Sequence, residues 1–166
     1  MKILGIDPGT ARTGYGVIQS VGKKIKVIDY GCIETPKEDS DAKRLNQTYR
    51  EVCKLIKAKQ PHMVVIERLF FFKNMKTVMT VSQSRGVVLM ACHQKKLNIF
   101  EYTPLEIKQT LTGYGRSKKK EMQLSVKKHL GLEDIPRPDD AADALACAIC
   151  YHLRKNSPKK EKKNKK

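Results

Sequence analysis

The start of the chain has the pattern of a buried strand that ends in a carboxylate. The apolar run 3–6 is followed by Asp7 and then at once by a Pro-Gly pair, which marks a turn. Segments 14–20 and 24–33 alternate between apolar and polar positions, and a Val-Gly-Lys turn separates them. The pattern predicts a three-stranded antiparallel opening, with Asp7 held at the end of its first strand.

The next part of the chain changes from a helical pattern to a strand pattern. Apolar positions recur at helical spacing up to about Lys59, and Asp39 or Ser40 is expected to cap this helix. The continuous apolar run 62–67 then predicts a strand that is buried on both faces of a parallel sheet, and it ends at Glu67. Two strands are therefore expected to deliver acids to the same edge of one sheet.

A long helix is predicted from Met75 to Lys96, followed by a fifth strand over 97–102. The middle of this helix contains the small residues Ser82, Ser84 and Gly86. Small side chains allow another backbone to approach closely, and a sheet or a second subunit can supply that backbone. The helix is therefore the candidate for a contact between two subunits.

Three further helices complete the predicted order. A Thr-Pro pair opens a short helix that carries Lys108. Ser117 is expected to cap a helix that runs to about Leu130, and Asp139 is expected to cap the last helix. This order of strands and helices predicts an α/β fold of the ribonuclease H type, which is a mixed five-stranded sheet flanked by helices.

Charge is the strongest signal in the composition. The 166 residues include 34 Lys and Arg against 17 Asp and Glu, a formal net charge of +17. Residues 154–166 carry +7 of this excess and are predicted to form a basic, disordered tail, which leaves +10 on one predicted domain, residues 1–153. A basic excess of this size suits a polyanionic partner such as nucleic acid.

The five cysteines are odd in number and lie in apolar segments. This favours reduced thiols and a cytoplasmic location over a secreted disulfide framework. Cys147 and Cys150 form a Cys-x-x-Cys pair inside an apolar helical pattern, and core packing is favoured because no second pair accompanies them. The sequence shows no signal peptide and no long apolar span, so no membrane partner is expected.

Four carboxylates are expected to meet at one edge of the sheet, namely Asp7, Glu67, Asp140 and Asp143. The last two are three residues apart at a helix start, so they share a face, and the alanines around them allow that face to lie close to the sheet. Carboxylates about 5 Å apart repel by about 3 kcal/mol per pair at an effective dielectric of about 20. Such a cluster requires cations, and its oxygen donors favour Mg²⁺ or Mn²⁺ over Zn²⁺. Two such ions on a phosphodiester would activate water and stabilise the leaving oxygen.

Aromatic and basic residues flank this edge. Three consecutive Phe lie between Arg68 and Lys73, and at least one ring is expected to be exposed, where it can stack on a base. A cationic run at a helix start, 116–120, favours an anionic ligand. The candidate DNA-binding residues are Phe70, Phe71, Phe72, Lys73, Arg85, Arg116, Lys118 and Lys120.

Five short motifs resemble the RuvC family of Holliday junction resolvases. They are Gly-Ile-Asp-Pro-Gly at 5–9, Ile-Glu-Arg-Leu-Phe at 66–70, Gln-Ser-Arg-Gly at 83–86, Lys-Gln-Thr at 108–110 and Asp-Ala-Ala-Asp-Ala-Leu-Ala at 140–146. The match runs in order from Met1 to about Leu153. The resemblance implies a homodimeric, Mg²⁺-dependent endonuclease of recombination and repair. It implies that two opposed strands of a four-way DNA junction are cut, and that the RuvA and RuvB branch-migration proteins are partners.

The resemblance also implies residue roles. The metal ligands of the family correspond to Asp7, Glu67, Asp140 and Asp143. Lys108 and Lys119 fall on the lysines assigned to phosphate and transition-state contact, and Phe70 falls on the aromatic residue that stacks near the crossover. Because three lysines are consecutive, Lys118 and Lys120 are alternatives to Lys119. Phe71 and Phe72 are likewise alternatives to Phe70 as the stacking residue.

Three other classes of protein are consistent with parts of the sequence. The Asp-Pro-Gly-Thr stretch at 7–10 also resembles the phosphate loop of the actin and sugar kinase superfamily, but no second glycine-rich phosphate motif accompanies it. A monomeric nuclease of the same fold that acts on other nucleic-acid structures is the main alternative. A catalytically silent DNA-binding module explains the charge but not four converging acids.

Overall fold

The computed structural model describes residues 1–9, 11–68 and 75–157, and a five-stranded mixed sheet lies at its centre. In chain order the strands are β1 (Lys2–Pro8), β2 (Arg12–Val21), β3 (Lys24–Glu34), β4 (Met63–Glu67) and β5 (Asn98–Tyr102). Across the sheet the order is β3-β2-β1-β4-β5. β1 pairs antiparallel with β2 and parallel with β4. The predicted antiparallel opening and the mixed sheet are therefore confirmed.

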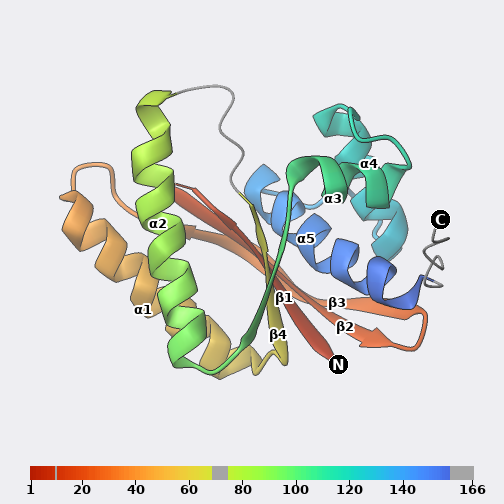
Figure 1. Ribbon diagram of the computed structural model, residues 1–166, viewed down its shortest axis with the longest axis horizontal. Helices are drawn as coiled ribbons and strands as arrows, with labels where there is room; N and C mark the ends of the chain where they lie inside the picture. The colour runs from red at the N-terminus through yellow and green to blue at the C-terminus, as the bar shows by residue number, and fades with distance from the viewer. Residues whose placement is uncertain (10, 69–74, 158–166) are drawn as a thin grey trace, which may run out of the picture.

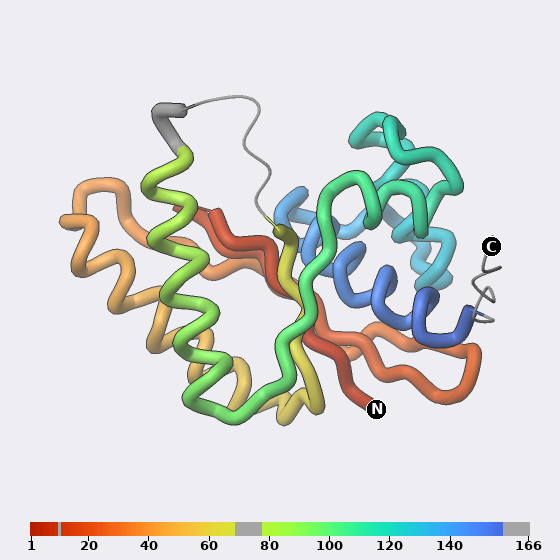
Figure 2. Tube along the Cα trace, in the orientation of Figure 1, coloured from red at the N-terminus to blue at the C-terminus, as the bar shows by residue number. Residues whose placement is uncertain are grey.

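Helices cover both faces of this sheet (Figures 1 and 2). They are α1 (Asp41–Lys59), α2 (Met75–Gln94), α3 (Pro104–Thr112), α4 (Lys119–Leu130) and α5 (Asp139–Asn156). α1 and α2 lie on one face, and α5 lies on the other with α3 and α4 beside it. An apolar cluster fills each side, with Ile3 towards α5 and Leu4 towards α1 and α2. Cys147 and Cys150 are fully buried in the α5 cluster, which confirms that they pack in the core.

Glycines on β1 and β2 allow α5 to pack directly on the sheet. A Cβ built on Gly5 would lie 1.9 Å from the carbonyl oxygen of Ala144, and a Cβ on Gly14 would lie 2.0 Å from that of Asp140. No real side chain tolerates either distance, so both positions require glycine. The predicted close approach of the alanine-rich helix face is confirmed, and it fixes the start of α5 beside the end of β1.

The predicted cap of α4 is wrong. Ser117 lies one residue too early, because Lys118 occupies the N-cap position. The Ser117 hydroxyl instead lies 2.7 Å from the hydroxyl of Thr112 and donates to the carbonyl oxygen of Tyr114 at 2.8 Å. It therefore closes the loop between α3 and α4.

The predicted cap of α5 is also wrong. Pro138 is the N-cap, and Asp139 is the first residue of the helix. The Asp139 carboxylate is drawn away from the helix end, because Nζ of Lys119 lies 3.2 Å from it. Ser40, in contrast, is confirmed as the cap of α1, where its hydroxyl oxygen accepts a hydrogen bond from a backbone N–H of the first turn.

The C-terminal helix extends into residues 154–156, which the sequence predicts to belong to a disordered tail. α5 ends at Asn156. Arg154 pairs with Glu106 of α3 at 3.4 Å and lies 5.0 Å from the centre of the Tyr102 ring. These contacts join residues 154–156 to the folded domain, and 158–166 lie outside the described residues. Within the described part of the chain, no helix combines the length and the apolar character that crossing a bilayer needs.

Gly5→Ala should lower the free energy of unfolding by about 3 kcal/mol or more, because its methyl group would overlap the backbone of α5. Gly22→Asn is the matched control. Gly22 has φ +56° and open space around it, and Asn tolerates that conformation. Denaturant unfolding of both variants in EDTA measures the difference. Equal stability of the two variants would show that α5 does not pack on Gly5.

Candidate functional site

Carboxylates from three elements meet at the carboxyl end of the central strands. Asp7 lies near the end of β1 and Glu67 at the end of β4, which is the parallel neighbour of β1. Asp140 and Asp143 lie in the first turns of α5, beside these strand ends. The charges of the other three acids all act on Asp7. The structure therefore brings together the four acids that the sequence predicted to converge.

Burial and mutual repulsion make these acids hard to ionise. Burial, followed by the charges of the other three carboxylates, raises the pKa of Asp7 to about 8. Burial and Asp143 raise the pKa of Glu67 to about 7, although Lys108 opposes this rise. Burial also raises the pKa of Asp143, against the attraction of Lys119. The lysines therefore stabilise the ionised acids only in part, and a bound cation would stabilise them further.

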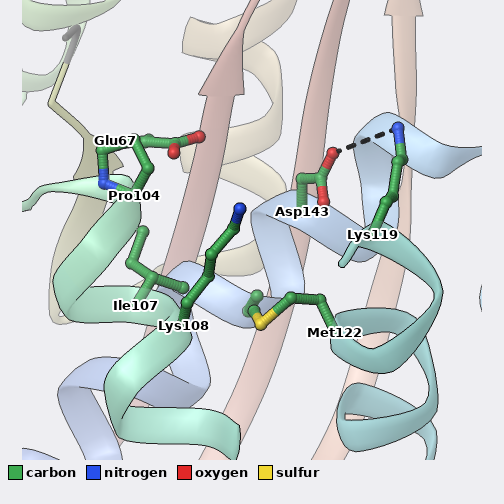
Figure 3. A pocket seen from close by; sticks show the side chains of 8 residues that line it. Glu67, Pro104, Ile107, Lys108, Lys119, Met122 and Asp143 are labelled. Carbon is green, nitrogen blue, oxygen red and sulfur yellow. Dashed lines mark ion pairs between the residues drawn. The ribbon is translucent and has the colours of Figure 1, made fainter. Parts of the chain in front are cut away.

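Two lysines border the carboxylates from the side of α3 and α4 (Figure 3). Glu67, Lys108, Lys119 and Asp143 line one cavity of about 240 Å³. Lys108 points into the space between the two acids. Nζ of Lys119 lies 3.2 Å from Asp139 and 3.6 Å from Asp143. Burial lowers the pKa of Lys119, but these acids outweigh burial and raise it overall, so the ammonium group stays charged.

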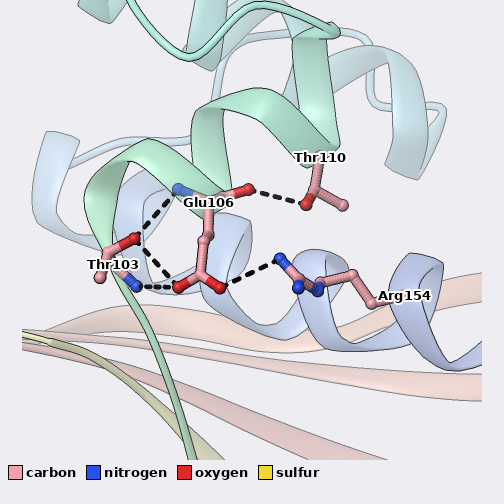
Figure 4. A network of polar contacts seen from close by, with 4 residues as sticks. All are labelled: Thr103, Glu106, Thr110 and Arg154. Carbon is pink, nitrogen blue, oxygen red and sulfur yellow. Dashed lines mark hydrogen bonds and ion pairs between the residues drawn. The ribbon is translucent and has the colours of Figure 1, made fainter. Parts of the chain in front are cut away.

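A polar network at the start of α3 fixes the helix that carries Lys108 (Figure 4). The Thr103 hydroxyl accepts from the backbone N–H of Glu106 at 3.2 Å, and the Glu106 carboxylate accepts from the backbone N–H of Thr103 at 2.9 Å. Arg154 of α5 pairs with the second carboxylate oxygen at 3.4 Å. The hydrogen bond from the Thr103 backbone is the main cause that lowers the pKa of Glu106. Since Lys108 is two residues further along this short helix, the network sets its place opposite the carboxylates.

The remaining predicted DNA contacts lie in different surroundings. Arg85 of α2 pairs with Glu101 of β5, and only 19% of its side chain is exposed. Arg116, Lys118 and Lys120 are exposed around the start of α4. Outside the described residues lie Phe70, Phe71, Phe72 and Lys73, so their roles stay predictions.

Sequence reasoning missed a second depression on the far side of Lys119. We call it the arginine depression, and its lining residues are Arg12, Lys119, Arg137, Pro138, Asp139 and Asp140. Its volume is about 660 Å³. Neither arginine belongs to a motif that the sequence singled out. The only signal for Arg137 is its place between two prolines directly before the acidic helix start.

By the chemistry of their donor atoms, the acids suit a hard divalent cation. They offer carboxylate oxygens, which Mg²⁺ and Mn²⁺ prefer, and burial together with the neighbouring carboxylates raises the pKa of Asp7 and of Glu67, so a bound cation would stabilise the ionised forms. Within the described ranges, no group of three His, Cys, Asp or Glu side chains is arranged so that it could hold a metal ion. A divalent cation at this edge would complete its coordination with water and with phosphate oxygens.

The chain is similar in sequence and in structure to nucleases of one family. A family profile described as crossover junction endodeoxyribonuclease RuvC matches residues 3–151. The protein of that name from Caldicellulosiruptor saccharolyticus is 52% identical over 158 residues, which cover 95% of each chain. The one from Syntrophomonas wolfei is 53% identical over 151 residues, which cover 91% of this chain and 88% of the relative.

The structural similarity extends over nearly the whole domain. A structure of Thermus thermophilus RuvC in complex with a Holliday junction substrate superimposes with a TM-score of 0.88 at 29% identity. The match covers 94% of this chain and 95% of that one. The predicted ribonuclease H-like fold is thereby confirmed. With both sequence and structure in agreement, this chain belongs to the RuvC family of crossover junction endodeoxyribonucleases.

Proposed function

We propose that this chain resolves four-way DNA junctions by nicking two opposed strands at symmetric positions. The observation that carries the proposal is the edge at which four partly buried carboxylates meet Lys108 and Lys119. Family membership supports the junction as substrate, since the Thermus thermophilus relative is described in complex with one. By the same resemblance, we propose RuvA and RuvB as partners and the cytoplasm as location.

The carboxylates are proposed to hold two Mg²⁺ ions, for which Mn²⁺ can substitute. Bound there, such ions supply an activated water and stabilise the oxygen that leaves the phosphate. Lys108 and Lys119 direct positive charge at the same phosphate from the side of α3 and α4. Asp139 and Asp143 hold the ammonium group of Lys119 in place before DNA binds. The network at the start of α3 fixes the helix that carries Lys108.

Paired cleavage requires two sites related by symmetry. A junction presents two equivalent strands, and one carboxylate cluster per chain can serve both only if two chains are related by a twofold axis. We therefore propose a homodimer. The alternative, a monomeric nuclease of this fold, would cut the strands in independent events.

The outer face of α2 is the proposed contact between the two chains. Met79, Gln83, Gly86 and Met90 are exposed and follow one another at intervals of four, three and four residues, so they share one face. Met79 is 71% exposed and Met90 is 48% exposed, which is unusual for large apolar residues. Ser84, which the sequence assigned to this contact, is buried on the opposite side of the helix. That part of the prediction is wrong.

Asp7→Asn should abolish cleavage of a synthetic four-way junction in Mg²⁺. We expect the rate to fall by at least about a hundredfold, the effect already typical of losing a residue that only supports a metal ligand. Junction binding in Ca²⁺ or EDTA should persist, because the change removes negative charge and no contact to phosphate. Gel-based cleavage and binding assays measure both quantities.

Asp134→Asn is the matched control for this change, because Asp134 is exposed between α4 and α5. It should cut at the normal rate. Undiminished cleavage by Asp7→Asn would exclude Asp7 from the site. A wild-type protein that prefers another nucleic-acid structure to the junction would favour the monomeric nuclease.

The metal-free protein should lose stability as the pH rises from about 4 to about 8. The folded-state pKa of Asp7 is about 8, and that of Glu67 is about 7. The unfolded chain has ordinary, lower values, so in this range the folded state binds more protons than the unfolded state and ionisation favours unfolding. We expect a loss on the order of 1–3 kcal/mol across the range. Thermal unfolding in EDTA measures it.

Two comparisons isolate the cause of this pH dependence. Asp7→Asn should flatten the slope and be more stable than wild type at pH 8 in EDTA. Mg²⁺ should stabilise wild type most at the high-pH end, where the acids must ionise. Identical pH profiles for wild type and Asp7→Asn would show that the charge of Asp7 does not lower the stability of the metal-free protein.

Gly86→Glu should yield monomers that fold normally but nick junction strands without coordination. No atom of the chain lies within 4 Å of a Cβ built on Gly86, so the longer side chain fits the single chain. In the dimer it would place a charge at the centre of the α2 contact. Leu124→Glu, at an exposed position of α4, is the control and should stay dimeric. Light scattering at micromolar concentration decides, and a monomeric wild type that still nicks in pairs would overturn the dimer.

A further inference from the structure

We propose that Arg12 and Arg137 bind a backbone phosphate that neighbours the scissile phosphate on the cut strand. The arginine depression would then continue the DNA path beyond Lys119. Its ligand is a phosphodiester of a DNA strand, and the two arginines act as positioning residues. This inference rests on the proposed function and extends its site.

Arg12 is placed by the turn that follows β1. A Cβ on Gly9 would lie 2.2 Å from the carbonyl oxygen of Arg12, so the two backbones are in close contact. Side chains two residues apart on a strand share a face of the sheet, and Gly14 faces the start of α5 at Asp140. Arg12 therefore projects on the same face, next to the acids of α5.

Arg137 is placed by the segment that leads into α5. Pro138 restricts the backbone of Arg137, because a proline limits the conformation of the residue before it, and Pro136 has its own φ fixed by its ring. The Arg137 side chain is 81% exposed, and its guanidinium lies 3.6 Å from Asp139. The two arginines thus reach the depression from separate elements, β2 and the segment before α5.

Both guanidinium groups are available for exchange onto phosphate. Arg12 pairs with Glu34 at 3.1 Å, and the two side chains are 55% and 61% exposed. Ion pairs this exposed contribute little to stability, so a phosphate can replace the carboxylate. Guanidinium also binds phosphate through two parallel hydrogen bonds, which fixes a strand more firmly than a lysine does.

Lys119 connects the arginine depression to the catalytic edge. It lines both the cavity with Glu67 and Lys108 and the depression with Arg12 and Arg137. A strand whose phosphate lies at the carboxylates, beside Lys119, therefore runs on into the depression. Lys108 and Lys119 at the scissile phosphate, and the two arginines at the neighbouring phosphate, would together hold the strand in line with the acids.

Junctions that carry a single uncharged methylphosphonate linkage test this contact. The linkage is moved in turn over the positions next to the cleavage site on both sides. With wild type in Mg²⁺, one of these positions should lower kcat/KM roughly tenfold, the scale of one charged hydrogen bond. R12A/R137A should lose a similar factor on the unmodified junction and nothing further at that position, because both changes remove the same contact. Effects that multiply at every position would overturn the proposal.

Two control variants separate the contact from structural and bulk-charge effects. Glu34→Gln breaks the same ion pair between β2 and β3 but keeps Arg12, so it should cleave like wild type. If it instead matches Arg12→Ala, the arginine only joins two strands and the proposal fails. Lys26→Ala/Lys57→Ala removes the same charge at the opposite end of the sheet and should keep the wild-type methylphosphonate profile.

These outcomes also separate this inference from the proposed function. The phosphate contact is refuted if wild type cleaves the unmodified junction and R12A/R137A behaves like the lysine control. That outcome leaves the proposed resolvase function standing. Absence of any wild-type cleavage in Mg²⁺ would refute the resolvase, and the phosphate contact with it.

Discussion

The close contact between α5 and the central strands is the constraint on which the rest of the structure depends. Because Gly5 has no side chain, the backbone of α5 reaches β1 at Ala144. The same approach at Gly14 sets the first turn of the helix against the end of the sheet. With a larger side chain in place of Gly5 or Gly14, Asp140 and Asp143 would lie further from Asp7. A single group of the substrate could then not contact all three acids.

This packing brings four acids close together, and the fold offsets their repulsion only in part. The acids of α5 lie in its first turns, where the positive end of the helix dipole favours them. Lys119 neutralises part of the negative charge of these acids. Even so, burial and repulsion keep the pKa of Asp7 near 8. The proposed cation site is thus built from groups that weaken the metal-free protein, a familiar conflict between stability and function.

The sequence determined most of the fold and the acids, because both follow from local patterns. An apolar run followed by an acid was enough to predict the strand ends at Asp7 and Glu67, and the alanines around Asp140 and Asp143 predicted the close helix packing. The errors lie where tertiary contacts override local preference. Ser117 and Asp139 have side chains that commonly cap helices. Here the Ser117 hydroxyl instead donates to the carbonyl oxygen of Tyr114, and the Asp139 carboxylate pairs with Lys119. The side of α2 on which Ser84 lies depends on contacts between distant parts of the chain. So does the depression that Arg12 and Arg137 line together.

The structure also bears on the three consecutive lysines that the sequence left unresolved. A helix start gives successive residues different directions, so only one of three neighbours can face a given point. Lys118 is the N-cap, and its backbone N–H donates to Glu121 at 2.6 Å, which directs the chain into the helix. Lys119, the first helical residue, then points at Asp139 and Asp143. Lys120 follows about a quarter of a turn further round the helix and is exposed. Of the three lysines, Lys119 is therefore the one whose ammonium group lies at the carboxylates.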